Sequence, residues 1–257
     1  MRILGAFIYG VPFLLCIWFG KLPLTLFVGL LIILSLLELR NMARLRNINI
    51  SLTISILFSL FFLSTSPWYW VFFRFITGAL LFTSAVRFII SREFDGWIWT
   101  VGSTFYIGWT LSHIPAFFTL PDGREWLLFT LPLVFSFDIF SFLVGKALGR
   151  RKIAPQVSPG KTWEGFLGGF ILTLAFSIPL RLLVKIPIWE ALLISGVISF
   201  LSLTGDLFES LLKRRFGVKD SGKIIPGHGG VLDRIDSLVF LSLIHISEPT
   251  RLGMISY

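Results

Sequence analysis

Cysteine and charged side chains are both scarce in this chain of 257 residues. The single cysteine, Cys16, excludes an intramolecular disulfide and a metal cage built from cysteines. Only 14% of the residues are charged while 55% are hydrophobic, and a soluble protein could not bury so much apolar surface. The chain also lacks a low-complexity linker that would mark a second, soluble domain. The composition therefore predicts a polytopic helical membrane protein of the all-α class.

Apolar segments of roughly the length that crosses a bilayer follow one another along the chain. We expect about nine transmembrane helices, at 3–19, 22–39, 48–63, 68–91, 94–119, 126–145, 163–184, 187–212 and 231–246. The first segment resembles a signal peptide, but no small-x-small cleavage site closes it, which favours a retained helix. The ninth segment is short for a span, so we interpret it as truncated.

Three regions follow from this pattern. Residues 1–125 are expected to form N-terminal membrane helices that also make a dimer contact. Residues 126–246 are expected to form a catalytic membrane region, because the polar residues of the chain concentrate there. Residues 247–257 form an atypical tail.

The formal net charge of +9 has a topological explanation that does not require a nucleic-acid partner. Basic residues concentrate in the cytoplasmic loops of membrane proteins. With the N-terminus inside, most of the lysines and arginines fall on the cytoplasmic side, including those of 146–161 and 213–223. We therefore expect a multi-pass protein of the cytoplasmic (inner) membrane, with its polar blocks facing the cytoplasm.

The main polar block, GDLFESLLKRRFGVKDSGKIIPGHGGVLDRID (205–236), mixes carboxylates, basic side chains and glycines. Carboxylates hold hard cations such as Mg²⁺, which also bind substrate phosphates. Lysine and arginine bind phosphate oxygens, and glycines let backbone N–H groups approach an anion closely. The block is thus typical of a metal-assisted phosphate site. The alternative is a juxtamembrane loop that binds anionic lipid headgroups, which would explain the lysines but not the acidic residues.

Two features upstream extend this block. Asp138 lies deep in an apolar segment, so its carboxylate should face a protein interior or a wet cavity, unless it forms a structural ion pair. In the second polar block (145–165), Ser158 and Pro159 predict a helix N-cap followed by the first helical residue. Lys161 and Thr162 would then lie in the first turn, where free N–H groups favour anions.

The residues from Ser210 to Asp236, SLLKRRFGVKDSGKIIPGHGGVLDRID, closely resemble the signature of the phosphatidate cytidylyltransferase (CDP-diacylglycerol synthase) family. The resemblance extends upstream to Asp138 and covers about 130–240, with one departure at Phe142, where relatives often have tyrosine. It implies a membrane-embedded homodimer that transfers CMP from CTP to phosphatidate with Mg²⁺. It further implies Asp206 and Asp233 as metal ligands, with room for a second cation such as K⁺.

The residue roles that we predict combine this resemblance with the chemistry of the side chains. Asp206 and Asp233 would bind the metal. The catalytic set would comprise Asp206, Asp233, Asp236, Asp138 and Lys219. The substrate-binding set would comprise Ser158, Lys161, Thr162, Lys213, Arg214, His228, Gly229, Gly230 and Arg234.

Two other functions remain open at this point. A cytidylyltransferase could act on another lipid phosphate, such as an isoprenoid or ether lipid, because the sequence does not reveal acyl chains. A transporter is the more distant alternative. Its intramembrane charges would have to cross the bilayer, whereas the charges here concentrate at the cytoplasmic end.

Overall fold

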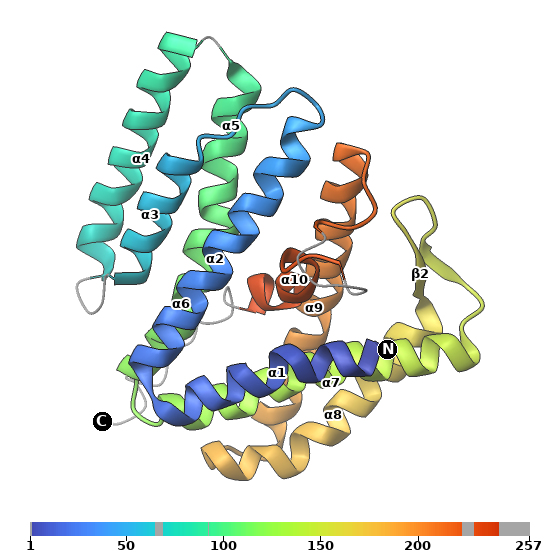
Figure 1. Cartoon of the computed structure of the whole chain (residues 1–257). Coiled ribbons are helices and arrows are strands. Elements are labelled where there is room, and N and C mark those ends of the chain that lie inside the picture. The colour runs from blue at the N-terminus through green and yellow to red at the C-terminus, as the bar shows by residue number, and fades with distance from the viewer. Residues whose placement is uncertain (1, 65–68, 92, 223–228, 242–257) are drawn as a thin grey trace.

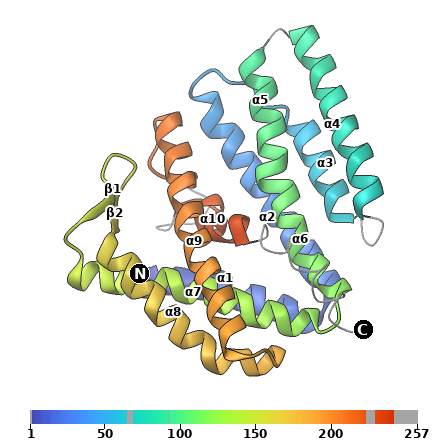
Figure 2. The ribbon, with the colours of Figure 1, turned by 180° about the vertical axis from the view of Figure 1, so that it is seen from behind.

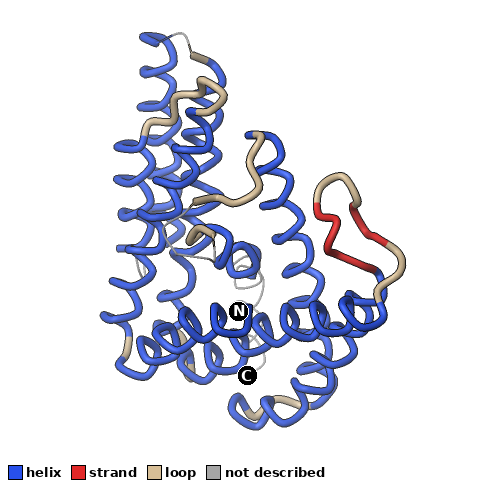
Figure 3. Tube along the Cα trace, turned by 45° about the vertical axis from the view of Figure 1, so that its right-hand side comes forward, coloured by secondary structure: helices blue, strands red, loops and turns tan. Residues whose placement is uncertain are grey.

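The computed structural model describes residues 2–64, 69–91, 93–222 and 229–241. Helices make up nearly all of these ranges, which confirms the predicted helical class (Figure 3). The helical elements are α1 (Arg2–Phe19), α2 (Lys21–Arg44), α3 (Leu52–Ser64), α4 (Tyr69–Ser91), α5 (Phe94–Ser103), the π-helix η1 (Thr104–Trp109), α6 (Thr110–Ala116), the 3₁₀-helix η2 (Phe117–Thr119), α7 (Gly123–Leu148), α8 (Trp163–Val184), α9 (Ile188–Phe216) and α10 (Leu232–Leu241).

Among the residues that the structure describes, four helices are long and apolar enough to cross a membrane, namely α2, α7, α8 and α9. With 22 to 29 residues each, they are about 33 to 44 Å long at 1.5 Å per residue, which exceeds the hydrocarbon core. The predicted count of about nine spans is not confirmed. Within the described ranges α3 has only 13 residues. The segment 94–119 is divided by a π-helix, and the end of the ninth segment, beyond residue 241, lies outside the described residues.

The helices form two groups, which α2 and α10 connect. Figure 1 shows α3, α4 and α5 side by side, while α1 and α7 lie at the other end of the molecule and are oriented crosswise to them. Viewed from behind, α9 rises from the α7–α8 pair, and the short α10 lies between α9 and α2 (Figure 2). α10 contacts α9, α2, α6 and α7. The start of α10 is therefore held by helices from both halves of the chain.

Small residues let α7 and α8 pack closely, as membrane helices require. A Cβ added at Gly165 would lie 2.7 Å from the Ser141 carbonyl oxygen, and one at Gly169 would lie 2.8 Å from the Ser141 Cβ. Larger side chains would push the helices apart. This contact fixes the helix that carries Asp138 against the start of α8.

The predicted helix start at Ser158 is wrong. Residues Ser158–Thr162 form strand β2, which pairs antiparallel with β1 (Lys152–Ala154) in a small hairpin. The N-cap of α8 is Thr162, whose hydroxyl accepts a hydrogen bond from Gly165 N at 3.1 Å. Both Ser158 and Thr162 have a hydroxyl that suits a cap, and only Thr162 directly precedes the apolar run. Pro159 is tolerated because a two-stranded hairpin has free edges.

The polar end of α9 is shaped by Gly217. Its φ of +77° is the left-handed conformation that glycine adopts readily at a helix C-terminus. The N–H groups of Gly217 and Val218 bond to the carbonyls of Arg214 and Lys213, both at 3.0 Å. The chain turns back here toward α10. Pro226 and Gly227, a pair that is typical of a turn, lie outside the described residues.

Candidate active site

A cavity of about 770 Å³ lies between α7, the hairpin, α9 and the start of α10. Its lining includes eleven of the residues that the sequence predicted for the site: Asp138, Ser158, Lys161, Thr162, Asp206, Lys213, Arg214, Lys219, Asp233, Arg234 and Asp236. Residues nearly 100 positions apart in the chain thus meet at one place. Gly229 and Gly230 lie beside Asp233, and His228 is outside the described residues.

Asp206 lies on the side of the cavity formed by the hairpin, which we call the hairpin side. It forms an ion pair with Lys161 of β2, and both side chains keep about a quarter of their surface exposed, 22% and 24%. Burial alone would lower the pKa of Lys161, but the charges of Asp206, Asp138 and Asp236 outweigh burial and raise this pKa above its ordinary value. Lys161 is therefore a permanent cation that faces three carboxylates.

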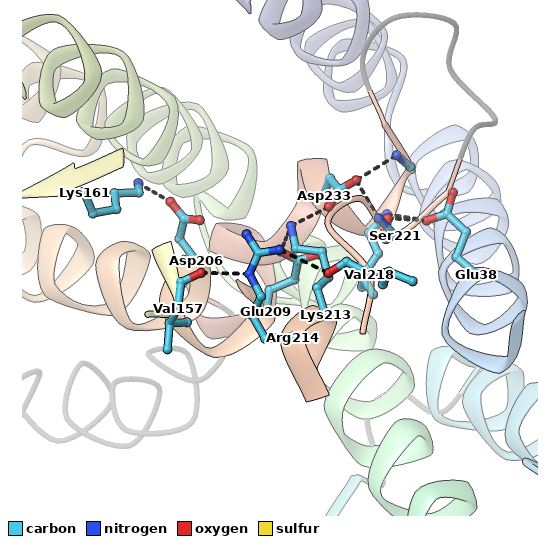
Figure 4. Close-up of polar contacts among 12 residues, drawn as sticks. Glu38, Val157, Lys161, Asp206, Glu209, Lys213, Arg214, Val218, Ser221 and Asp233 are labelled. Atoms are coloured by element: carbon cyan, nitrogen blue, oxygen red, sulfur yellow. Dashed lines mark hydrogen bonds and ion pairs between the residues drawn. The ribbon is translucent and has the colours of Figure 1, made fainter. Parts of the chain in front are cut away.

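Lys213 occupies the equivalent place beside Asp233, on what we call the loop side. Its Nζ lies 2.6 Å from Asp233 Oδ1 and 2.5 Å from Glu209 Oε2 (Figure 4). Glu209 is one helical turn before Lys213 and its side chain is fully buried. Because α9 places both on one face, Glu209 holds the lysine toward Asp233.

The second oxygen of Asp233 is held by the backbone. Asp233 Oδ2 accepts hydrogen bonds from the N–H groups of Gly230, at 2.8 Å, and Ser221, at 3.0 Å. Gly229 has a φ of +85°, and a Cβ there would lie 2.5 Å from the same oxygen. Glycine is needed at this position for both reasons. Its predicted role in substrate binding stays a prediction.

Arg214 connects the two sides. Its Nε donates to the carbonyl of Val157 in the hairpin at 3.3 Å, and its Nη1 donates to the carbonyl of Val218 at 3.4 Å (Figure 4). The side chain is otherwise exposed. Arg214 thus links the hairpin to the end of α9 across the cavity.

The donor set suits a hard cation. Five aspartates line the cavity, Asp138, Asp206, Asp220, Asp233 and Asp236, and carboxylate oxygens are the ligands that Mg²⁺ prefers. The ammonium groups of Lys161 and Lys213 already lie against Asp206 and Asp233, so a positive charge is stabilised at both places. Among the residues that the structure describes, no three acidic, histidine or cysteine side chains form a complete metal cage. A cation here would take few protein ligands and share itself with waters or phosphates, as Mg²⁺ does.

Sequence reasoning missed several residues of this site. Lys146 and Lys152 line the cavity but were assigned only to the topology. Glu38, on α2, bonds to residues beside Asp233 and received no role. The available signal was that Glu38 is the only acidic residue in the apolar segment 22–39, which is the argument that singled out Asp138.

Comparison of the sequence with known proteins identifies the family. The sequence model of the Cytidylyltransferase family matches residues 1–247. Phosphatidate cytidylyltransferase of Bacillus subtilis (strain 168) is 34% identical over 253 residues, which cover 93% of each chain. The protein of the same name from Staphylococcus haemolyticus is 35% identical over 249 residues, covering 94% of this chain and 95% of its own.

A third relative has a higher sequence identity, but over a smaller part of the chain. The uncharacterized protein YnbB of Escherichia coli (strain K12) is 44% identical over 167 residues, which cover 64% of this chain and 55% of YnbB. The chain thus spans about half the length of YnbB. Since the family match covers nearly the whole sequence, the chain belongs to the Cytidylyltransferase family.

Proposed function

We propose that this membrane protein transfers CMP from CTP to phosphatidate, giving CDP-diacylglycerol and pyrophosphate. The observation that carries the proposal is one cavity that is lined by five aspartates and seven basic side chains, among them Lys161, Lys213, Arg214, Lys219 and Arg234. Relatives that bear the name phosphatidate cytidylyltransferase align over nearly their whole length. Both substrates are polyanions, and such a cavity can neutralise them together.

The chemistry needs no strong base. A phosphate monoester carries nearly two negative charges at neutral pH, because its second pKa is about 6. One of its oxygens attacks the α-phosphorus of CTP, a new P–O bond forms, and the bond to the β-phosphate oxygen breaks. Pyrophosphate leaves with that electron pair. Positioning and charge stabilisation dominate such transfers.

Asp206 and Asp233 are the residues that would hold Mg²⁺, with Asp138 and Asp236 as accessory ligands or ligands of a second cation such as K⁺. When bound, the metal would neutralise phosphate oxygens and the charge that develops on pyrophosphate. Lys161 and Lys213 now lie against the carboxylates. As substrate and metal enter, these two lysines would turn toward phosphate oxygens, so the total charge in the cavity stays balanced.

The remaining predicted residues would act on the substrates directly. Arg214, Lys219 and Arg234 would bind phosphates, while Ser158 and Thr162 lie at the hairpin end of the cavity. His228, Gly229 and Gly230 would contact phosphate or the pyrimidine.

The lipid would enter from the apolar side of the cavity. Phe142 and Leu143 line it and expose 37% and 47% of their surface. Phe142 stands where relatives often have tyrosine and contributes no hydroxyl. A lining that is charged in one part and apolar in another fits a lipid phosphate better than a soluble one.

We further propose a homodimer with about nine membrane segments in the cytoplasmic membrane and the cavity open to the cytoplasm, where CTP is available. Gln156 is exposed in the hairpin loop. A Gln156→Cys variant in a Cys16→Ser background should react with an impermeant thiol reagent in inside-out vesicles only. Labelling in intact cells would contradict the orientation.

The reaction is tested with purified protein in lipid vesicles and two forms of labelled CTP. Label in the α-phosphate should enter a chloroform-soluble product when phosphatidate is supplied, whereas label in the γ-phosphate should stay in the aqueous phase as pyrophosphate. Diacylglycerol, which lacks the nucleophilic phosphate, is the matched control and should give no product. Faster transfer to an isoprenoid or ether-lipid phosphate would contradict the substrate that we propose.

A further inference from the structure

Glu38 is a buried carboxylate on α2 that the proposed reaction does not use directly. Only 2% of its surface is exposed, in a helix whose other buried residues are apolar apart from Ser35. A buried charge is costly unless hydrogen bonds compensate it. We propose that Glu38 is a positioning residue, which fixes the backbone around Asp233 and thereby sets the geometry of the loop side of the active site. The proposal rests on the proposed function for its effect on turnover.

The partners of Glu38 are more than 180 residues away in the chain. Glu38 Oε2 accepts hydrogen bonds from the Ser221 hydroxyl at 3.0 Å and from Leu232 N at 2.9 Å. Glu38 Oε1 accepts one from Val231 N at 2.8 Å. One carboxylate therefore binds residues on both sides of the segment that joins Ser221 to Val231. Figure 4 shows Glu38 and Asp233 on either side of Ser221.

Two glycines make room for this carboxylate. A Cβ at Gly222 would lie 2.5 Å from Glu38 Oε1, and a Cβ at Gly230 would lie 2.4 Å from Glu38 Oε2. Neither glycine has a positive φ, since the described glycines with positive φ are Gly20, Gly217 and Gly229. Space for Glu38, and at 230 also for the Ser221 hydroxyl, is thus the reason for glycine at these positions, rather than backbone freedom.

The same backbone groups hold Asp233. Ser221 donates its hydroxyl to Glu38 and its N–H to Asp233. Gly230 N–H bonds to Asp233, while the next two N–H groups bond to Glu38. The two carboxylates therefore hold opposite faces of one short piece of backbone. Glu38 also places a negative charge at the N-terminus of α10, where the helix dipole favours it.

This arrangement makes a prediction that a purely space-filling role does not. Glu38→Gln keeps the size of the side chain but replaces one acceptor oxygen with a donor, so at least one of the three N–H or O–H groups loses its partner. Asp233 would keep its ion pair with Lys213, but the backbone N–H groups that bind it would no longer be held in place by Glu38. Ser221→Ala removes a single hydrogen bond to Glu38 and should have a smaller effect of the same kind.

The experiment compares Glu38→Gln and Ser221→Ala with the control Glu190→Gln. Glu190 is a carboxylate in the first turn of α9, at the end of that helix away from Asp206 and Lys213. Turnover and the Mg²⁺ concentration for half-maximal CMP transfer are measured well below the unfolding temperature of every variant. We expect Glu38→Gln to lower turnover at least about tenfold and to raise the Mg²⁺ requirement. Ser221→Ala should show a smaller change, and Glu190→Gln none. Hydrogen exchange of the amides at 231 and 232 should accelerate in Glu38→Gln.

Wild-type turnover and Mg²⁺ requirement in Glu38→Gln, or a loss of activity that only follows the unfolding temperature, would overturn the proposal. Unchanged exchange at 231 and 232 would also overturn it. The exchange readout needs no activity, so it tests Glu38 even if the wild-type chain transfers no CMP. A wild-type chain that transfers no CMP would instead contradict the proposed function.

Discussion

The two sides of the cavity hold their key carboxylates in different ways. On the hairpin side, Asp206 has one ion-pair partner, Lys161, and both are partly exposed. On the loop side, Asp233 is bound by Lys213 and two backbone N–H groups, and Glu38 supports the same backbone from behind. The comparison teaches that the protein preorganises the Asp233 carboxylate through its backbone, whereas Asp206 has only a side-chain partner and can rearrange when substrate enters.

Of the changes that test this comparison, removal of Mg²⁺ should have the largest effect on CMP transfer. A chelator should reduce CMP transfer to background, because the carboxylates and the CTP phosphates would then repel one another. The amides at 231 and 232 should stay protected, since protein contacts alone hold the loop side. Restored transfer on adding Mg²⁺ back is the control. Transfer that persists in excess chelator would contradict a metal-dependent reaction.

Substitution of the two carboxylates should have the second-largest effect on turnover. Asp206→Asn and Asp233→Asn keep the side-chain size but remove the charge, and each should lower turnover by at least about 10²-fold, or about 2.7 kcal/mol. Of the two variants, only Asp233→Asn should also speed exchange of the Ser221 and Gly230 amides, because Asp233 accepts hydrogen bonds from both. Near-normal transfer by either variant at low Mg²⁺ would place the cation at Asp138 and Asp236 instead.

The two lysines should differ in stability. Lys213→Met leaves the fully buried Glu209 without its ion-pair partner, which should destabilise the fold by about 3 kcal/mol. The double variant Lys213→Met with Glu209→Gln should recover much of that loss. Lys161→Met should lower turnover with little change in the unfolding temperature, as its pair is partly exposed. Equal unfolding temperatures of the two lysine variants in detergent would contradict this difference.

The sequence predicted the parts of the site that depend on local pattern. The polar block 205–236 supplies most of the charged residues that line the cavity, and Asp138 lines the same cavity, as expected of a carboxylate deep in an apolar helix. The sequence did not predict the hairpin, since Ser158 and Thr162 carry the same capping signal. Glu38 was missed because its partners are brought to it only by the packing of α10 against α2.

The smallest effect expected is that of the cap which joins the hairpin to α8. Thr162→Ala removes the hydrogen bond from Gly165 N, which should cost about 1 kcal/mol of stability. The matched control is Thr25→Ala on α2, whose hydroxyl bonds only to a carbonyl of its own helix start, Lys21 O. If both variants unfold at the wild-type temperature, the hairpin side is less dependent on this cap than the structure indicates.

The most direct test asks whether the two sides act on one bound group. Turnover is measured for Asp206→Asn, Asp233→Asn and the double variant at saturating CTP and phosphatidate. If both carboxylates hold the same cation against the same phosphates, the double variant should be about as slow as the slower single variant, because residues that act as a unit are not additive. Losses that multiply in the double variant would mean that the two sides act independently, and would contradict a single shared site.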